Sequence, residues 1–509
     1  MWTSQSGLLG VMLTAPAIVA TLAFTVGQQA PRRFGQAGAI TATAGFVAAA
    51  FMVVAVGKGH DISVGLLGGE FAVDRLAAVL LLLVFGVSAI VQAFAVRYLA
   101  GDPRAAWFFG GAGLLTAASA GLTSAATLLT LAACWTAAGA ALCLLLATYW
   151  HLPAARDGVR RTVTAFVIGD LALWAAVIAA TAIWGRIDLR TADLSGPIVP
   201  VLGVLVVVAA LSRSGQIPFH RWLPATLAAP TPVSALLHAG VVNAGGILLI
   251  RMAALATDDL ARAVTIIAGA VTMAYGAAIM LVKPDIKGAL AHSTTAQMGF
   301  MILTCGLGLW AAAVIHLFAH GFYKATLFLS SGSAIAGRRR HEGLPPARPL
   351  TRGQLLTNGA AALVLPAAAL GAALTLVPLA PGDHAAEHAL LIFAFVTGAA
   401  LTWGWLQRRP GLTGALIGAA FLAPAAIAYV AIINGVTGFL TPALPASTMP
   451  VTVVWIITAA AAVALGALAL TRWAPGAEGV RRAIYTSALS AGHIPARQSL
   501  ATATTGARS

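Results

Sequence analysis

Residues 316–325 read HLFAHGFYKA and lie within an apolar run that extends from about 310 to 336. An apolar run of about 20 residues is long enough to cross a bilayer as a helix. His316, His320 and Lys324 are four residues apart, so they share one helix face over about 12 Å. Ionisable groups at membrane depth cost about 2.5–3.5 kcal/mol each on insertion scales and usually mark ion paths. The segment therefore predicts a membrane helix with a titratable stripe, and interhelical hydrogen bonding for packing is the alternative reading.

The rest of the chain shares this apolar character. Of its 509 residues, 60% are hydrophobic and only 9% are charged, against about 25% in soluble domains. The sequence predicts an all-α polytopic membrane protein with about 14–15 transmembrane helices. Fifteen candidate spans lie near residues 7–27, 37–57, 75–96, 106–122, 125–149, 162–184, 197–219, 231–251, 263–282, 288–308, 310–336, 353–378, 387–407, 411–433 and 450–471.

The net charge of +15 does not indicate nucleic-acid binding, because the basic residues lie in short loops between apolar runs. Loop arginines and lysines instead set the orientation of a membrane protein. Most of them face the cytoplasm if the N-terminus is outside, and the acidic residues then gather on outer segments. We expect a multi-pass protein of the cell (inner) membrane with an outer N-terminus and a cytoplasmic C-terminus.

Two charged groups of opposite sign, Asp170 and Arg213, also fall within predicted spans. Gly215 and Pro218 follow Arg213 closely and indicate a broken helix, and broken helices in membranes usually line cavities or ion sites. Asp170 and Arg213 both lie about 9–12 Å from the inner ends of their spans. We expect them to form an ion pair, and the alternative is that Arg213 snorkels to the inner surface.

His238 is a further ionisable residue within a span. Pro230 and Pro232 precede its helix and so do not kink it. The side chain then lies about 10 Å deep, where it is either an inner partner of the stripe on 316–324 or a packing residue.

Metal and cofactor sites are not predicted for this chain. Cys134, Cys143 and Cys305 all lie in apolar runs without a CxxC pair, and no Cys/His set has the spacing of zinc ligands. We expect a transport subunit, with no catalytic residues and no bound metal.

The chain resembles the large proton-pumping membrane subunits of complex I (subunit L type) and their cation/proton antiporter relatives. The resemblance covers about residues 60–340, and its strongest segments are 219–224 (FHRWLP), 230–239 (PTPVSALLHA), 283–287 (KPDIK), 293–299 (STTAQMG) and 316–325. It implies two inverted five-helix repeats with broken helices. The implied divisions are N-terminal helices at 1–105, an antiporter-like core at 106–340 with repeats at about 106–255 and 260–405, C-terminal helices at 341–472, and a disordered basic cytoplasmic tail at 473–509.

Two positions depart from that family. Thr136 stands where the family has a glutamate, and Arg213 stands where it has a lysine. Threonine carries no charge, and arginine releases protons too reluctantly to relay them. There is also no lysine in a span after Lys324, and the long lateral helix is missing. These departures argue against a complex I pump module of the usual kind.

A related branch, the DabB membrane subunits of inorganic carbon transporters, is more similar in length and in segments 220–224, 228–246 and 327–334. This resemblance implies a subunit that conducts a proton or sodium ion and energises uptake of carbon dioxide or bicarbonate. The implied partner is a peripheral zinc-containing, DabA-like subunit that resembles carbonic anhydrase. The expected ion path includes Lys324, His320, His316 and His238.

Two other functions stay open from the sequence. One is a proton-translocating subunit of an NADH-quinone oxidoreductase or Mrp-type antiporter complex. The other is a structural membrane anchor with a non-conducting path, which the changes at Thr136 and Arg213 would allow.

Overall fold

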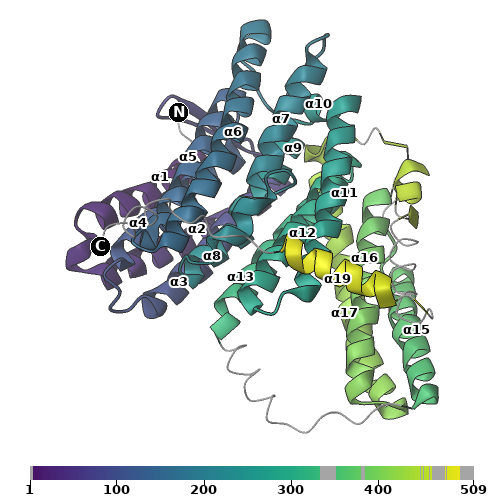
Figure 1. Ribbon diagram of the computed structural model, residues 1–509. Coiled ribbons are helices and arrows are strands. Elements are labelled where there is room, and N and C mark those ends of the chain that lie inside the picture. Colours follow the sequence, from purple (N-terminus) through teal and green to yellow (C-terminus); the bar gives the residue numbers. More distant parts are fainter. Residues whose placement is uncertain are drawn as a thin grey trace, which may run out of the picture. The chain divides into compact units, whose positions relative to one another are not determined.

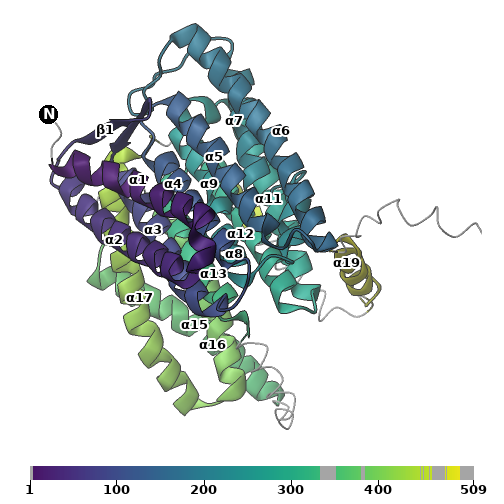
Figure 2. The ribbon, with the colours of Figure 1, turned by 90° about the vertical axis from the view of Figure 1, so that its left-hand side faces the viewer.

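The computed structural model is built almost entirely from helices (Figures 1 and 2). It describes residues 4–332, 351–379, 384–446, 449–450, 452–457, 459–460, 476 and 478–492. The chain forms two compact units. The first takes its described residues from Met1–Gly306, Leu317–Ser331 and Thr458–Ser509, and the second from Leu307–His316 and Gly332–Ile457.

The first unit contains most of the helices. They are α1 (Ser4–Thr25), α2 (Pro31–Gly57), α3 (Arg75–Tyr98), α4 (Ala105–Ser124), α5 (Leu128–Leu146), α6 (Pro153–Trp184), α7 (Val199–Arg213), α8 (Thr231–Ala239), α9 (Ala244–Arg251), α10 (Ala253–Ala256), α11 (Asp259–Val282), α12 (Ile286–Gly306) and α19 (Glu478–Ala491). Helix α13 (Trp310–Leu329) belongs to both units, because its residues up to His316 lie in the second and those from Leu317 onward lie in the first.

The second unit is a smaller helical assembly. Its long helices are α15 (Arg352–Leu376), α16 (Ala385–Arg408) and α17 (Leu412–Leu440). Ala373, Ala426 and Val430 form its buried apolar contact. Tyr429 donates a hydrogen bond to the Leu390 carbonyl at 3.0 Å, and this bond ties α17 to α16.

The predicted class of polytopic helical membrane protein is confirmed. Within the described ranges, twelve helical stretches are long and apolar enough to cross a membrane, with α8 and α9 counted as one stretch. Helix α12 occupies the predicted span 288–308, and α7 occupies the predicted span 197–219 with only 15 residues. The last predicted span, 450–471, lies mostly outside the described residues. The division into two inverted repeats stays a prediction.

Two helices break where the sequence places glycine. Helix α7 ends at Arg213, and Gly215 follows with φ +60, a left-handed conformation that glycine adopts without strain. Helix α8 ends at Ala239, and the chain passes through Gly240 and a 3₁₀ turn at Val241–Asn243 before α9 begins. The Asn243 side-chain amide donates to the Ala239 carbonyl at 2.8 Å. It thereby satisfies one backbone acceptor that has no partner within the helix because of the break.

A β-hairpin between α2 and α3 is the main feature that the sequence analysis does not predict. Strands β1 (Ile62–Leu66) and β2 (Gly69–Val73) pair antiparallel, and Leu67 and Gly68 at the turn both have positive φ. That conformation matches the right-handed twist of a two-residue hairpin. The strands are short and each contains a glycine. Their alternation of buried and exposed residues is therefore difficult to recognise in the sequence between two long apolar runs.

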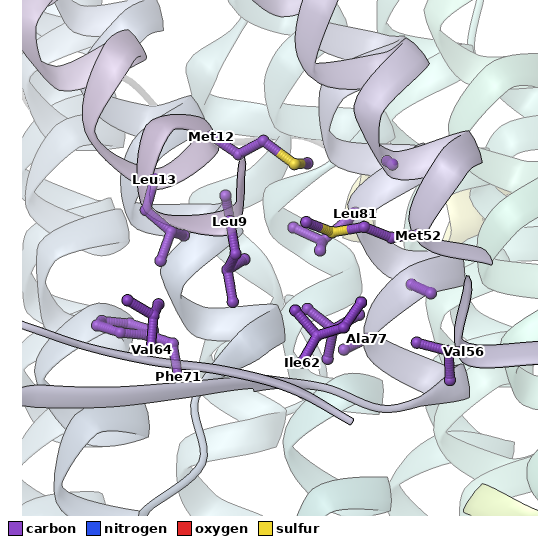
Figure 3. Packing of buried hydrophobic residues seen from close by; sticks show 14 of the residues in the cluster. Leu9, Met12, Leu13, Met52, Val56, Ile62, Val64, Phe71, Ala77 and Leu81 are labelled. Atoms are coloured by element: carbon purple, nitrogen blue, oxygen red, sulfur yellow. The ribbon is translucent and has the colours of Figure 1, made fainter. Parts of the chain in front are cut away.

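The hairpin closes an apolar core at one end of the first helices (Figure 3). Side chains from α1, α2, the two strands and α3 meet there, and the labelled ones are Leu9, Met12, Leu13, Met52, Val56, Ile62, Val64, Phe71, Ala77 and Leu81.

Helices α11 and α12 pack backbone against backbone. A Cβ atom added at Gly276 would lie 2.5 Å from the Ala296 nitrogen and 2.8 Å from the His292 carbonyl oxygen. One added at Gly269 would lie 2.6 Å from the Leu303 nitrogen. Small residues at such seams allow membrane helices to approach closely.

Part of the predicted disordered tail is helical. Helix α19 lies within residues 473–509, and its apolar residues Val480, Ile484 and Ala488 recur every four positions. The tail is rich in alanine, serine and threonine, so its average composition hides this short helical pattern.

An ion pair connects the start of α3 to the end of α9. Asp74 caps α3 by accepting the Ala77 backbone N–H at 2.7 Å, and both of its carboxylate oxygens accept from the Arg251 guanidinium. Burial raises the pKa of Asp74, but the Arg251 charge and these hydrogen bonds together hold it below its ordinary value.

Replacement of Arg251 by methionine should lower the free energy of unfolding of the detergent-solubilised protein by about 2 kcal/mol near pH 7, because it leaves a half-buried carboxylate without its partner. A carboxyl group with a depressed pKa stabilises the fold above its ordinary pKa, and that stabilisation is lost as pH falls through the depressed value. The difference between wild type and Arg251→Met should therefore shrink below about pH 4.

The exposed Arg190 provides the matched control. It pairs with Asp188 at 3.2 Å on the surface, and such pairs contribute about 0–1 kcal/mol. Chemical denaturation of both variants from pH 3 to 7 checks the expectation, and equal losses in Arg190→Met and Arg251→Met would contradict it.

Candidate functional site

Arg213 is completely buried at the end of α7 and is held from several directions. Its Nη2 donates to Asp170 Oδ1 at 2.8 Å, and its Nη1 donates to the Trp135 carbonyl at 3.1 Å. The guanidinium carbon lies 4.4 Å from the centre of the Trp135 ring and 4.1 Å from that of Phe166. The expected ion pair is thus present, and Arg213 does not snorkel to a surface.

Helix α5 is shaped around this guanidinium. A Cβ atom at Gly139 would lie 2.8 Å from Arg213 Nη2, so a larger residue there would displace the guanidinium from its present position. The Trp135 indole also donates to Asp170 Oδ1 at 2.8 Å, so one carboxylate oxygen accepts from both the guanidinium and the indole. We call Trp135, Phe166, Asp170 and Arg213 the arginine cluster. Its charges are neutralised in place by fixed partners.

Thr136 is not a member of the arginine cluster and carries no charge that could pair with Arg213. Its hydroxyl accepts a hydrogen bond from the Trp174 indole at 3.0 Å and so links α5 to α6. The countercharge to Arg213 comes from Asp170 on α6.

A cavity of about 60 Å³ lies beside Arg213 and has mostly apolar walls. Its polar lining includes Ser88, Thr116 and Asn243. The Ser88 and Thr116 hydroxyls are 2.7 Å apart, and the Gln92 amide donates to Ser88 at 2.8 Å. A cavity of this size with several polar groups has room for a few water molecules.

His238 lies at the break that follows α8 and is fully buried. Its ring stacks on Phe328 of α13, with centroids 4.3 Å apart and an interplanar angle of 13°. Neither ring nitrogen has a hydrogen-bond partner among the described residues. The stacking therefore places His238 against α13, the helix that carries Lys324.

Lys324 is 1% exposed and faces α12. Its ammonium group donates to the Ser293 hydroxyl and to the Leu290 carbonyl, the latter at 3.4 Å. A Cβ atom at Gly321 would lie 2.9 Å from the Ala239 carbonyl oxygen, so this glycine brings α13 close to the end of α8. We call His238, Ser293, Lys324 and Phe328 the lysine cluster.

The other two members of the predicted stripe lie along α13. His320 is buried in the first unit. His316 is buried in the second unit, where its ring meets Phe393 edge-on at 6.3 Å. Their common helix supports the predicted stripe, and their role in an ion path stays a prediction.

Sequence reasoning missed the neutral members of both clusters. Trp135 and Ser293 carry no charge. Their burial in a membrane lacks the free-energy cost that makes a charged residue stand out in an apolar run. The run Ser293-Thr294-Thr295 within a span was the available signal, because three consecutive small polar residues are unusual in an apolar helix.

Removal of either charge from the arginine cluster should destabilise the protein strongly. We expect Asp170→Asn and Arg213→Met each to cost about 3 kcal/mol, because each leaves a buried partner uncompensated. The double variant should cost less than the sum of the two, and a double-mutant cycle on thermal unfolding in detergent measures this coupling.

The Asp157–Arg161 pair on α6, which is less than a quarter exposed, is the control. Asp157→Asn should cost below about 1 kcal/mol, because the pair lies one helical turn apart near the surface. Additive losses in the Asp170 and Arg213 variants would show that the ion pair does not stabilise the fold.

Comparison with known proteins identifies the family to which these clusters belong. Residues 125–402 match the family described as NADH:quinone oxidoreductase/Mrp antiporter, TM. Residues 64–109 match the N-terminal part of chain 5 of NADH-ubiquinone oxidoreductase (complex I).

Relatives of two kinds are similar to this chain. The probable inorganic carbon transporter subunit DabB1 of Halothiobacillus neapolitanus is 36% identical over 360 residues, which cover 66% of this chain and 64% of the relative. The NADH-quinone oxidoreductase subunit L of Mycobacterium tuberculosis is 33% identical over 355 residues, which cover 66% of this chain and 56% of the relative. The chain thus spans less than two thirds of the length of these relatives. The probable DabB of Bacillus subtilis is 33% identical, with 71% of each chain covered.

Solved structures share the fold at low sequence identity. The Mrp complex from Dietzia sp. gives a TM-score of 0.61 at 23% identity, with 95% of this chain and 59% of that chain covered. The membrane-bound sulfane sulfur reductase, an archaeal respiratory complex, gives 0.64 at 19% identity, with 85% and 96% covered. With the family match over residues 125–402, these findings show that the chain belongs to the NADH:quinone oxidoreductase/Mrp antiporter transmembrane family and is an antiporter-like membrane subunit similar to DabB and to subunit L.

Proposed function

We propose that this subunit conducts a cation, either a proton or a sodium ion, through the lysine cluster. The observation that carries the proposal is the environment of Lys324. Its buried ammonium group meets only neutral acceptors, Ser293 and Leu290, and it forms no ion pair within the part of the chain that the structure describes. Loss of its proton removes a buried charge without stranding a counterion, so this site is able to change charge.

The arginine cluster supports the same assignment by contrast. Arg213 is clamped by Asp170 and by two aromatic rings, and a guanidinium keeps its proton at any physiological pH. We therefore assign it a fixed positive charge beside the cavity. The mobile charge would pass through His238, Lys324 and His320, with His316 included from its position on the same helix.

The finer proposal is that the conducted ion energises uptake of inorganic carbon. The support is the 36% identity to a DabB1 subunit, together with Thr136 and Arg213, which depart from the complex I pattern. The partner would be a peripheral zinc-containing subunit that hydrates carbon dioxide, and the proposal assigns the zinc to that partner. Movement would be inward, with the N-terminus outside and the C-terminus in the cytoplasm of a cell membrane.

Replacement of Lys324 should abolish ion flux while leaving the protein folded. We expect Lys324→Gln in proteoliposomes to lose at least about 90% of flux driven by a pH or sodium gradient, because glutamine keeps a hydrogen-bond donor but cannot change charge. A pH-sensitive dye inside the vesicles measures protons, and a sodium indicator measures sodium.

Lys58→Gln is the matched control, because Lys58 is exposed at the end of α2. It should conduct like wild type. If wild type and Lys324→Gln were equally impermeable to both ions in the reconstituted complex, the subunit would be a structural anchor.

Identification of the native partner separates inorganic carbon uptake from the second candidate function. Subunit L of NADH-quinone oxidoreductase is 33% identical and favours a respiratory complex. Affinity purification of the full chain from its native membrane, followed by mass analysis, should recover one large zinc-containing protein with carbonic anhydrase activity. Recovery of a set of quinone-oxidoreductase subunits would contradict the carbon-uptake proposal and support the respiratory one.

A further inference from the structure

His292 of α12 is a buried histidine that neither cluster accounts for. It is 1% exposed, and neither of its ring nitrogens has a hydrogen-bond partner among the described residues. Most buried polar side chains in proteins are hydrogen-bonded, so such a group calls for a reason. Its helical turn, residues 290–293, is the turn that binds the Lys324 ammonium through Leu290 and Ser293.

Two further rings extend from His292 toward the surface of the first unit. Tyr275 of α11 lies edge-on to His292 with ring centroids 6.5 Å apart, and edge-on to His220 at 4.7 Å. His292 is buried, whereas Tyr275 and His220 are partly exposed. The row His292–Tyr275–His220 therefore runs from the interior to an accessible surface.

Backbone geometry fixes this row. Gly276 allows α11 to touch the backbone of α12 at the His292 carbonyl, which places the neighbouring Tyr275 beside the His292 ring. His220 begins the 3₁₀ segment His220–Thr226 that follows the break after α7. Its loop is held to α11 because the Ile217 backbone N–H donates to the Thr272 hydroxyl at 3.0 Å.

The end of α19 contacts α11 at Tyr275 and at the following Lys283. The Tyr275 hydroxyl donates to the Ala491 carbonyl at 3.2 Å, and the Lys283 ammonium donates to the Gly492 carbonyl at 2.9 Å. The charged groups that act on His292 are Lys283, His220 and Asp285, and Arg221 acts on His220 and Tyr275. The tyrosine proton is thus engaged by α19, and the two imidazoles are the groups in the row that remain able to take up a proton.

We propose that His292 is a further proton carrier, which exchanges protons between Lys324 and the aqueous phase beside His220. The inference rests on the proposed conduction through Lys324, with a proton as the ion. The Lys324 ammonium gives up one proton by way of the Ser293 hydroxyl or a water and becomes a neutral amine. One ring nitrogen of His292 takes up that proton, the other ring nitrogen releases one to water near His220, and the imidazole returns neutral.

Removal of the imidazole and its chemical replacement test this role. In proteoliposomes, His292→Gly and His292→Asn should both reduce Lys324-dependent proton flux about tenfold, less than the full 10²–10⁴-fold value of a positioned acid–base group because water replaces part of the relay. Added imidazole should restore flux in His292→Gly and not in His292→Asn, since only glycine leaves the space of the ring empty. A purely structural role would not give this rescue.

His151→Gly is the matched control, because His151 is exposed and lies outside the row. It should conduct normally with or without imidazole. Normal flux in both His292 variants, or a folded His292→Gly whose reduced flux imidazole does not restore, would overturn this inference and leave conduction through Lys324 standing. Absence of Lys324-dependent flux in wild type would overturn both.

Discussion

The cost of holding an ionised side chain away from water governs this structure. Moving a carboxylate, ammonium or guanidinium into a low-dielectric interior costs several kcal/mol even after relaxation, so each buried charge needs a partner, water or the freedom to become neutral. The first unit stabilises its buried charges in two different ways. Arg213 receives a carboxylate, a carbonyl and two aromatic faces. Lys324 receives one hydroxyl and one carbonyl. The first arrangement locks a charge, and the second permits its loss.

Two helix breaks lie beside these charges. Arg213 is the last residue of α7, and the break after Ala239 follows directly on His238. A break exposes backbone acceptors that a continuous helix would satisfy itself. The Trp222 indole donates to the Ser212 carbonyl at 2.9 Å beside the end of α7, and Ser214 donates to the Val242 carbonyl at 2.6 Å between the two breaks. The breaks after Arg213 and Ala239 are thus joined to each other, and the cavity beside Arg213 includes residues of the second one.

The sequence predicts the helical membrane class and the positions of the fourteen helical spans that lie within the described residues, because a long apolar run in a membrane can satisfy its backbone only as a helix. It also predicts the Asp170–Arg213 pair, because opposite charges at equal depth have a strong reason to meet. It does not reveal Trp135, Ser293 or the hairpin at 62–73. The roles of these residues depend on which helix and strand faces pack together. A neutral residue costs little at membrane depth, so no charge marks it in the sequence. His292 was not predicted as a site residue, since it stands directly before the polar run Ser293-Thr294-Thr295 near the start of its helix.

A direct measurement of water at the Lys324 ammonium tests the central claim. The chain has only four lysines, Lys58, Lys283, Lys287 and Lys324, so a lysine-selective ¹⁵N solid-state NMR spectrum in lipid contains few signals, and Lys324→Gln assigns the one of interest. We predict a Lys324 Nζ resonance with a cross-peak to water protons. A Lys324 resonance that contacts only lipid or protein protons, with no water cross-peak, would contradict it.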